Sequence, residues 1–305
     1  MTTIPLIALV GPTAVGKTAL SLALAERLGG EIICADSRQI YRQMDIGTAK
    51  PTPAERAAVP HHLLDIADPG EDFSLARYQD VATAAIAEVA GRGRLPLLVG
   101  GTGQYLAALL EGWQIPRVAP QPELRARLEQ QAASVGVAAL HTRLAAIDPT
   151  AAAGIAPTNL RRIIRALEVY EVSGQPISAQ QTKIPPPYTT RTIWLTLPAT
   201  QLYARIDRRV DAMMAAGLLD EVRGLVERGY KFDMPAMSSL GYREFKPLLE
   251  GTATLDECIQ RLKFNTHAFA RRQPAWFRRL PNVAPLAADA PDVVAQALGV
   301  IRVIG

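Results

Sequence analysis

The most informative segment of this 305-residue chain is a glycine-rich loop near its start, which matches the pattern G-x-x-x-x-G-K-[ST]. An apolar run, Ile4 to Val10, precedes the loop, and a helix-like stretch from Ala19 to Leu28 follows it. Backbone N–H groups and the positive end of a helix dipole therefore converge on one point, which suits a polyphosphate. The loop consists of Gly11, Pro12, Thr13, Ala14, Val15, Gly16, Lys17 and Thr18.

Two side chains of this loop are suited to act on a bound polyphosphate. Lys17 would bring a positive charge to the phosphate oxygens, and the hydroxyl of Thr18 is a ligand for Mg²⁺, the expected cofactor. Gly11 and Gly16 allow the tight backbone curl. The loop alone leaves kinases, ATPases, GTPases and group transferases open.

The residues that follow the other strand-like runs help to choose among these protein classes. ATP-hydrolysing machines usually end one such strand in an Asp that supports Mg²⁺, whereas the run Leu95 to Val99 continues into Gly100-Gly101-Thr102. The nearest acid is Asp36, after the run Glu31 to Ala35, and we expect that strand to lie beside the phosphate loop. A carboxylate there is placed to take a proton from an incoming nucleophile. Helix capping and Mg²⁺ support are the alternative roles of Asp36.

Strand-like and helical patterns alternate through the first third of the chain. Apolar runs occur at Ile4 to Val10, Glu31 to Ala35, His62 to Ile66 and Leu95 to Val99, with helical patterns at Thr18 to Leu28 and Leu75 to Arg92. Continuous apolar runs indicate strands buried on both faces. The pattern predicts an α/β fold, a doubly wound parallel sheet like that of P-loop NTPases, with ligands at the carboxyl ends of the strands.

The pattern changes after Trp113. Helical segments follow at Pro122 to Ala133, Val137 to Ile147 and Asn159 to Val172, before the strand-like run Ile193 to Leu197. This order predicts an all-helical domain inserted into the sheet domain. We place the core at residues 1–113, the insertion at 114–187 and the return to the core at 188–305. The last part is expected to be helical, with one helix from Gln201 to Arg228 and another from Leu255 to Gln273, opened by a capping box at Thr254 to Glu257.

Basic residues gather in two places. Between Ile259 and Leu280 no acid occurs, and Arg261, Lys263, Arg271, Arg272, Arg278 and Arg279 interleave with Phe264, Phe269, Trp276 and Phe277. A second cluster on a predicted helix of the insertion contains Arg161, Arg162 and Arg165. Arginines beside aromatic residues suit phosphate contacts and base stacking on irregular or single-stranded RNA. Solvated helix faces are the alternative interpretation of each cluster.

Composition excludes several classes. Only Cys34 and Cys258 are present, which rules out a disulfide framework, and the four histidines lack metal-ligand spacing. The net charge of +4 weakly favours an anionic partner. No stretch approaches the ~18 to 20 apolar residues of a membrane span, and the N-terminus lacks a signal sequence. We therefore expect no membrane partner, a cytoplasmic location and a monomer.

Eight short blocks together resemble the bacterial tRNA dimethylallyltransferases, also called tRNA isopentenyltransferases. The match follows the order of the family over nearly the whole chain. The blocks are the phosphate loop, Asp36 to Tyr41, Met44 to Pro51, His61 to Asp65, Val99 to Gly103, Arg165 to Val169, Gly241 to Arg243 and Arg271 to Gln273. The resemblance implies transfer of a dimethylallyl group from dimethylallyl diphosphate to the exocyclic amine of the adenosine 3′ of the anticodon in tRNA, with release of diphosphate.

The resemblance also implies roles for individual residues. The phosphate loop would hold the diphosphate with Mg²⁺ at Thr18, Asp36 would be the general base, and Thr102 would lie against the flipped-out base. Arg209 would offset charge on the leaving diphosphate, with Arg208 as a competing candidate. The insertion would clasp the anticodon stem-loop. Contacts to tRNA are expected from Asp36, Ser37, Arg38, Gln39, Thr102, Arg125, Arg161, Arg162, Arg165, Ser238, Gly241, Tyr242, Arg243, Arg271, Arg272, Gln273, Trp276 and Arg278.

Three other functions are compatible with part of the sequence. A small-molecule kinase also pairs a phosphate loop with an acid after the second strand, but it needs no basic aromatic segment. Prenylation of a free adenine nucleotide would leave the insertion without a purpose. An RNA-binding module with a structural nucleotide would leave Asp36 and Thr102 unused.

Overall fold

The computed structural model describes residues 3–302 and divides into two compact units. Unit 1 runs from the start of the chain to Glu111 and resumes at Pro186, and unit 2 comprises Gly112–Pro185. The boundaries of unit 2 lie two residues before those predicted for the insertion, 114–187. The outermost residues of its core ranges, 1–2 and 303–305, lie outside the described residues.

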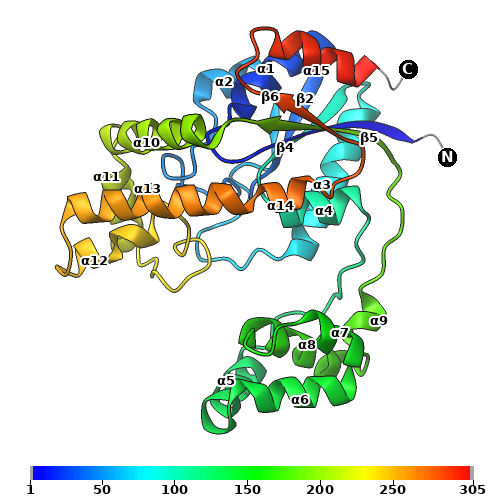
Figure 1. Ribbon diagram of the computed structural model, residues 1–305, viewed down its shortest axis with the longest axis vertical. Coiled ribbons are helices and arrows are strands. Elements are labelled where there is room, and N and C mark those ends of the chain that lie inside the picture. Colours follow the sequence, from blue (N-terminus) through cyan, green and yellow to red (C-terminus); the bar gives the residue numbers. More distant parts are fainter. Residues whose placement is uncertain (1–2, 303–305) are drawn as a thin grey trace. The chain divides into compact units, whose positions relative to one another are not determined.

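Unit 1 is built on a parallel sheet (Figure 1). Its strands are β1 (Ile4–Val10), β2 (Gly30–Ala35), β3 (His61–His62), β4 (Leu95–Gly100), β5 (Tyr188–Thr196) and β6 (Val283–Ala287). They lie in the order β3-β2-β4-β1-β5-β6, and every pair is parallel. Gly100 pairs with Val10 on one side and with Ala35 on the other, so three strands end at the same level.

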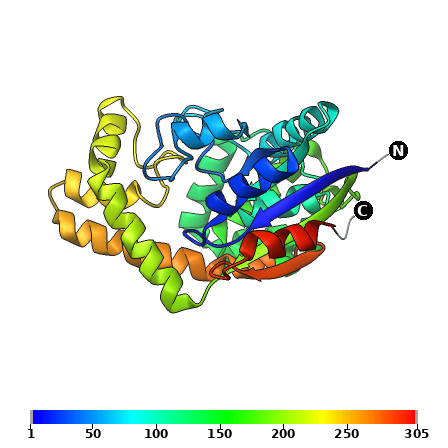
Figure 2. The ribbon, with the colours of Figure 1, turned by 90° about the horizontal axis from the view of Figure 1, so that it is seen from above.

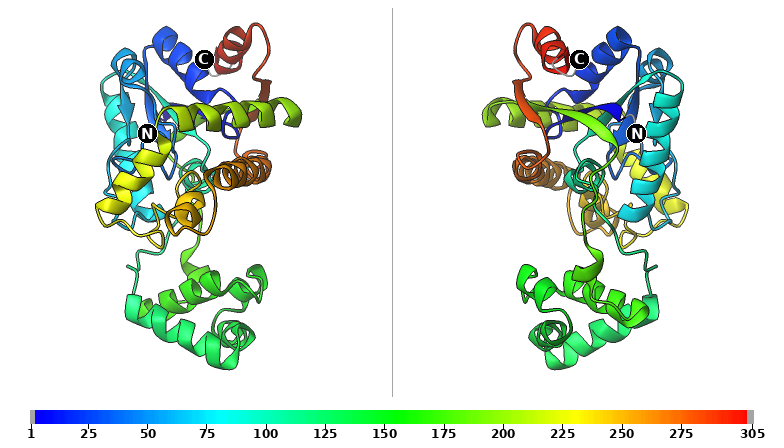
Figure 3. Two further views of the ribbon diagram at one scale, coloured as in Figure 1. Left: turned by 90° about the vertical axis from the view of Figure 1, so that its left-hand side faces the viewer. Right: turned by 90° about the vertical axis from the view of Figure 1, so that its right-hand side faces the viewer.

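Helices cover both faces of this sheet. In unit 1 they are α1 (Lys17–Leu28), α2 (Pro53–Ala58), α3 (Leu75–Gly91), α4 (Gly103–Leu110), α10 (Ala199–Ala215), α11 (Leu218–Glu227), α12 (Lys246–Leu249), α13 (Leu255–Arg272), α14 (Pro274–Phe277) and α15 (Val293–Arg302), with a 3₁₀ turn at Arg243–Phe245. Helix α1 packs beside α15 (Figure 3), and α10 packs against α13 (Figure 2).

The connections explain this layering. From β1 the chain steps through α1 across β4 to β2, whereas α3 and α4 lead back in the opposite direction. Because such crossovers are right-handed, opposite directions place the helices on opposite faces. The central strands are buried on both sides, as continuous apolar runs indicate. The predicted doubly wound P-loop-like fold is confirmed.

Unit 2 is all-helical, with α5 (Pro122–Val135), α6 (Val137–Ile147), α7 (Pro149–Gly154), α8 (Leu160–Ser173) and α9 (Ile177–Gln180). It has a hydrophobic core of its own, which includes Leu128, Leu144 and Leu167. The two segments that enter and leave it pair antiparallel, with Gln114 N donating to Thr182 O at 2.8 Å. The insertion is therefore a separately packed helical unit.

Two predicted elements are wrong. The expected strand His62 to Ile66 is reduced to the two residues of β3, because Leu63 and Asp65 adopt left-handed backbone conformations with φ of 66° and 57°. The expected single helix Gln201 to Arg228 is split into α10 and α11 at Gly217, whose φ is 95°.

Two further features differ from the expectation. The strand that ends before Asp36 does not neighbour the strand of the phosphate loop, because β4 lies between β2 and β1. The C-terminal part is not wholly helical, since β6 extends the sheet at its edge. The capping box predicted at Thr254 to Glu257 is confirmed at the start of α13. Within residues 3–302 no helix is long and apolar enough to cross a membrane.

Candidate active site

A cavity of about 810 Å³ opens at the carboxyl ends of the strands in unit 1. Its lining combines the phosphate loop, the segments that follow β2 and β4, and residues of α10 and α13. The predicted residues that it brings together are Thr13, Ala14, Gly16, Lys17, Thr18, Asp36, Ser37, Arg38, Gln39, Thr102, Arg209, Ser238, Gly241, Arg243, Arg272, Gln273 and Trp276.

Lys17 is held close to the backbone of its own loop. Its Nζ donates to the carbonyl oxygens of Gly11 and Pro12, each at 2.9 Å. Desolvation lowers the pKa of Lys17 to about 8, although the negative charge of Asp36 opposes this shift. The ammonium is thus pre-oriented at the phosphate loop and poised to gain an anionic partner.

Helix α10 contributes two arginines to the phosphate loop. Nη1 of Arg209 donates to Oγ1 of Thr13 at 3.2 Å, and Nη1 of Arg205 donates to the carbonyl oxygen of Val15 at 3.2 Å. Burial lowers the pKa of Arg209, again opposed by the charge of Asp36, and its guanidinium remains charged. Arg208 is exposed. The geometry therefore favours Arg209 over Arg208 as the arginine at the phosphate loop.

Sequence reasoning missed Arg205. Its signal is the spacing of four residues from Arg209, which places both on one face of a helix. Sequence reasoning also missed the apolar lining residues Ile206, Val210, Met213 and Leu262, and it assigned Phe269 to the basic aromatic segment rather than to the cavity.

Asp36 and Thr102 follow β2 and β4, two neighbouring strands that end at the same level. The backbone N–H of Ser37 donates to Oγ1 of Thr102 at 3.0 Å, and the N–H of Thr102 donates to the carbonyl oxygen of Ala35 at 3.2 Å. Oδ1 of Asp36 accepts the N–H of Arg38 at 2.9 Å. Although β4 separates their strands, β1 and β2 end at the same level, which brings Asp36 and the phosphate loop into one cavity.

Gln273 has internal partners. Its Oε1 accepts the N–H of Thr13 at 3.0 Å, and its Nε2 donates to the carbonyl oxygen of Gly101 at 2.9 Å. The residue is 5% exposed. Because both ends of the amide bind the protein backbone, we revise its expected role from tRNA contact to support of the phosphate loop.

Tyr242 is also internal. It is fully buried, and its hydroxyl donates to Oε1 of Glu221 at 2.7 Å. Burial and the neighbouring carboxylate hold its pKa well above the ordinary value. We therefore revise its expected role from tRNA contact to support of the cavity wall.

In the basic segment near the C-terminus some side chains are exposed to solvent and others are buried. Arg271, Arg272 and Arg278 are exposed, and Phe264 is 67% exposed. Phe277 is buried in the core, where no RNA base can reach it. A Cβ atom on Gly103 would approach the ring of Trp276 to 2.3 Å, so one side of this ring packs on the protein.

In unit 2 the four arginines expected to contact tRNA fall into two groups. Glu168 is fully buried and accepts from Nε of Arg125 at 2.7 Å and from Nη1 of Arg165 at 2.6 Å. Desolvation would raise the pKa of Glu168, but hydrogen bonds from Arg125, the N–H of Gln121 and Arg165 hold it below its ordinary value. Arg125 and Arg165 thus neutralise a buried charge, whereas Arg161 and Arg162 are exposed.

No group of three or more His, Cys, Asp and Glu residues able to hold a metal occurs within residues 3–302. Thr18 is exposed and lines the cavity together with Asp36. A divalent cation that is partly coordinated by a bound polyphosphate needs few protein ligands. The hydroxyl and the carboxylate fit such a cation.

The fold and the cavity define a phosphate-loop α/β protein in which a polyphosphate site adjoins a carboxylate. The family model described as IPP transferase matches residues 39–280, and the model described as Isopentenyl transferase matches residues 4–65. The chain belongs to the IPP transferase family.

Relatives agree over nearly the full chain. A curated protein named tRNA dimethylallyltransferase from Roseiflexus sp. (strain RS-1) is 72% identical over 98% of both chains. The crystal structure of the tRNA isopentenylpyrophosphate transferase from Bacillus halodurans is 45% identical, covers 98% of this chain and 95% of its own, and has a TM-score of 0.73. The structure of a eukaryotic dimethylallyltransferase acting on tRNA is 27% identical, covers 97% of this chain and 78% of its own, and has a TM-score of 0.82.

The pKa of Lys17 predicts how diphosphate binding depends on pH. Binding an anion favours the charged ammonium, so the affinity is full below about pH 8 and weakens as the pH rises through the pKa of Lys17. We expect calorimetric titration with inorganic diphosphate and Mg²⁺ to show a decline towards about tenfold per pH unit well above pH 8. The Lys17→Arg variant stays charged and isolates this effect from titration of the ligand. Equal pH dependence of the two proteins would contradict the prediction.

The contacts of Gln273 predict the effect of Gln273→Glu. The carboxylate keeps an acceptor for Thr13 N–H, but it loses the donor to Gly101 and adds negative charge beside the phosphate loop. Diphosphate affinity should fall by about tenfold or more, with tRNA affinity nearly unchanged. Arg272→Gln, one residue away and exposed, is the control and should weaken RNA binding instead. Loss of tRNA affinity alone in Gln273→Glu would return Gln273 to the tRNA interface.

Proposed function

We propose that this protein transfers a dimethylallyl group from dimethylallyl diphosphate to the exocyclic amine of the adenosine 3′ of the anticodon in tRNA, releasing diphosphate. The observation that carries the proposal is one cavity that joins a phosphate loop to Asp36 and Thr102. The relatives named tRNA dimethylallyltransferase support the choice of substrates.

The donor occupies the phosphate-loop end of the cavity. Lys17 and Arg209 bind the diphosphate and offset the charge that develops as the allylic C–O bond breaks. The apolar residues of α10 and α13, such as Val210 and Leu262, line the same cavity. They suit a short hydrocarbon group, which gains free energy by leaving water.

The acceptor occupies the end where β2 and β4 finish. The adenine must leave its stack to bring its amine into the cavity. As the amine nitrogen attacks the allylic carbon, a C–N bond forms, the C–O bond to diphosphate breaks, and the carboxylate of Asp36 takes a proton from the nitrogen. The Thr102 hydroxyl, oriented by Ser37, lies against the base.

Magnesium is the proposed cofactor. The Thr18 hydroxyl would hold it. When bound, the ion neutralises charge on the diphosphate. This assignment rests on the phosphate-loop pattern and on the oxygen donors that the cavity offers.

The tRNA is proposed to contact exposed arginines of both units. These are Arg161 and Arg162 in the helical insertion, which would clasp the anticodon stem-loop, and Arg271, Arg272 and Arg278 near the C-terminus. A tRNA substrate supports action in the cytoplasm.

The assay that tests the function follows two labels. Purified protein is incubated with labelled dimethylallyl diphosphate or γ-labelled ATP, with and without tRNA. We expect label from the prenyl donor in tRNA, one diphosphate per modified tRNA, and little ATP turnover, because β4 ends in glycines rather than in an acid. Transfer of label from ATP to a product would indicate a kinase. Prenyl label in free adenine nucleotide, and none in tRNA, would indicate an enzyme that prenylates the nucleotide.

Asp36→Asn tests the base. Asn preserves the shape of the side chain but cannot take a proton, so single-turnover transfer at saturating substrates should slow by ~10² to 10⁴. Affinities for tRNA and diphosphate should be nearly unchanged. Asp72→Asn, the same change at an exposed aspartate outside the cavity lining, is the matched control. A rate within about threefold of wild type, under 1 kcal/mol of barrier, would remove Asp36 as the base. Equal loss of affinity would make it a binding residue.

A further inference from the structure

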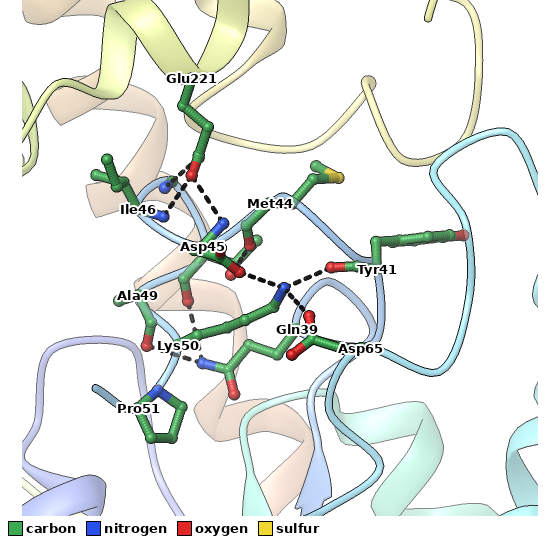
Figure 4. A network of polar contacts seen from close by, with 12 residues as sticks. Gln39, Tyr41, Met44, Asp45, Ile46, Ala49, Lys50, Pro51, Asp65 and Glu221 are labelled. Atoms are coloured by element: carbon green, nitrogen blue, oxygen red, sulfur yellow. Dashed lines mark hydrogen bonds and ion pairs between the residues drawn. The ribbon is translucent and has the colours of Figure 1, made fainter. Parts of the chain in front are cut away.

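Glu221 on α11 lies outside the lining of the cavity, yet it binds one of the cavity walls. Its Oε2 accepts the backbone N–H groups of Asp45 and Ile46, both at 2.8 Å, and its Oε1 accepts the N–H of Gly47 at 3.0 Å. Figure 4 shows Glu221 above the loop, with its bonds to Asp45 and Ile46 as dashed lines. Three consecutive N–H groups of one loop thus converge on a single carboxylate.

The same loop, residues 45–50, supplies the cavity wall at Gly47, Thr48 and Ala49. Its far end is fixed by Lys50, whose buried Nζ binds the carboxylates of Asp45 and Asp65, each at 2.6 Å (Figure 4). Buried charge is tolerated when it is paired in this way. The loop is therefore anchored at both ends by ionic side chains.

The hydroxyl of Tyr242 supplies the fourth hydrogen bond to Glu221. A Cβ atom on Gly47 would come within 2.6 Å of the Tyr242 ring, and one on Gly241 within 3.2 Å of the carbonyl oxygen of Gly47. Gly241 itself lines the cavity. Glu221 and Tyr242 thereby join two walls of the cavity at a close backbone approach.

We propose that Glu221 is a positioning residue for the acceptor end of the cavity, one that fixes the wall at 47–49 against the wall at 238–241. The inference rests on the proposed function and adds to it a residue that acts through backbone groups rather than by touching substrate.

The hydrogen bonds that hold the wall at 47–49 connect it to the acceptor end of the cavity. Nε2 of Gln39 donates to the carbonyl oxygens of Thr48 and Ala49, at 3.1 and 3.0 Å, so the wall is bonded to the segment that carries Asp36. The phosphate loop has other supports, Gln273, Arg205 and Arg209. Release of the wall should therefore displace the adenine from Asp36 and leave the diphosphate site in place.

A carboxylate is required at position 221. Each of its oxygens accepts two hydrogen bonds, from Asp45 and Ile46 on one and from Gly47 and Tyr242 on the other. In Glu221→Gln either orientation of the amide turns its NH₂ group towards two donors. The variant keeps the size of the side chain but cannot accept all four of these hydrogen bonds.

Glu221→Gln should raise the KM for tRNA and lower the rate at saturation, by about tenfold in kcat/KM, because a misplaced acceptor reacts slowly. The KM for the prenyl donor and the affinity for inorganic diphosphate should stay within about twofold of wild type. Tyr242→Phe removes one of the four bonds and should show a smaller change in the same direction. Glu227→Gln, an exposed glutamate on the same helix, is the matched control.

Two results would overturn the inference. Unchanged tRNA parameters in Glu221→Gln would show that the wall does not depend on this carboxylate. Equal loss of tRNA and diphosphate binding, with a lowered melting temperature, would show that Glu221 contributes only to the stability of the fold. A wild-type protein that passes no prenyl label to tRNA would instead overturn the proposed function, before any variant is compared.

Discussion

The placement of the phosphate loop at the carboxyl end of a buried parallel strand constrains the rest of the site. A parallel sheet brings all its strand ends to one edge, so every group meant to act with the loop must follow another strand or reach that edge from a helix. Ala35 and Val10 flank Gly100 at the same level. Asp36 and the loop therefore share one cavity without being neighbours in the sheet.

Much of the cavity is held together by side chains that bind backbone groups. Gln273 links the phosphate loop to the turn at Gly101, and Glu221 gathers three N–H groups of the loop at 45–47. Such bonds satisfy buried polar groups that irregular segments cannot pair among themselves. The irregular walls of the cavity thus gain fixed positions from residues that have no need to meet a substrate.

Sequence reasoning recovered the parallel sheet, because its strands follow from apolar periodicity, and short motifs placed the candidate residues at the strand ends. It misjudged features set by tertiary contacts. Leu63 takes a left-handed conformation within an apolar run, and Tyr242 and Gln273 belong to motifs that give no sign of burial. Glu221 stands in an ordinary amphipathic helix. A local pattern cannot reveal which distant backbone such a carboxylate meets.

The two segments that connect the units run antiparallel, with Trp113 bridged to Lys183 and Ile184 N–H bonded to Gly112. The chain thus leaves and re-enters unit 1 at adjacent points, as at the base of a hairpin. A turn of a few residues would close this base as well as the whole helical insertion does. The spacing of the two points where the chain leaves and re-enters unit 1 is thus fixed by this base itself and does not depend on how the helices of unit 2 pack.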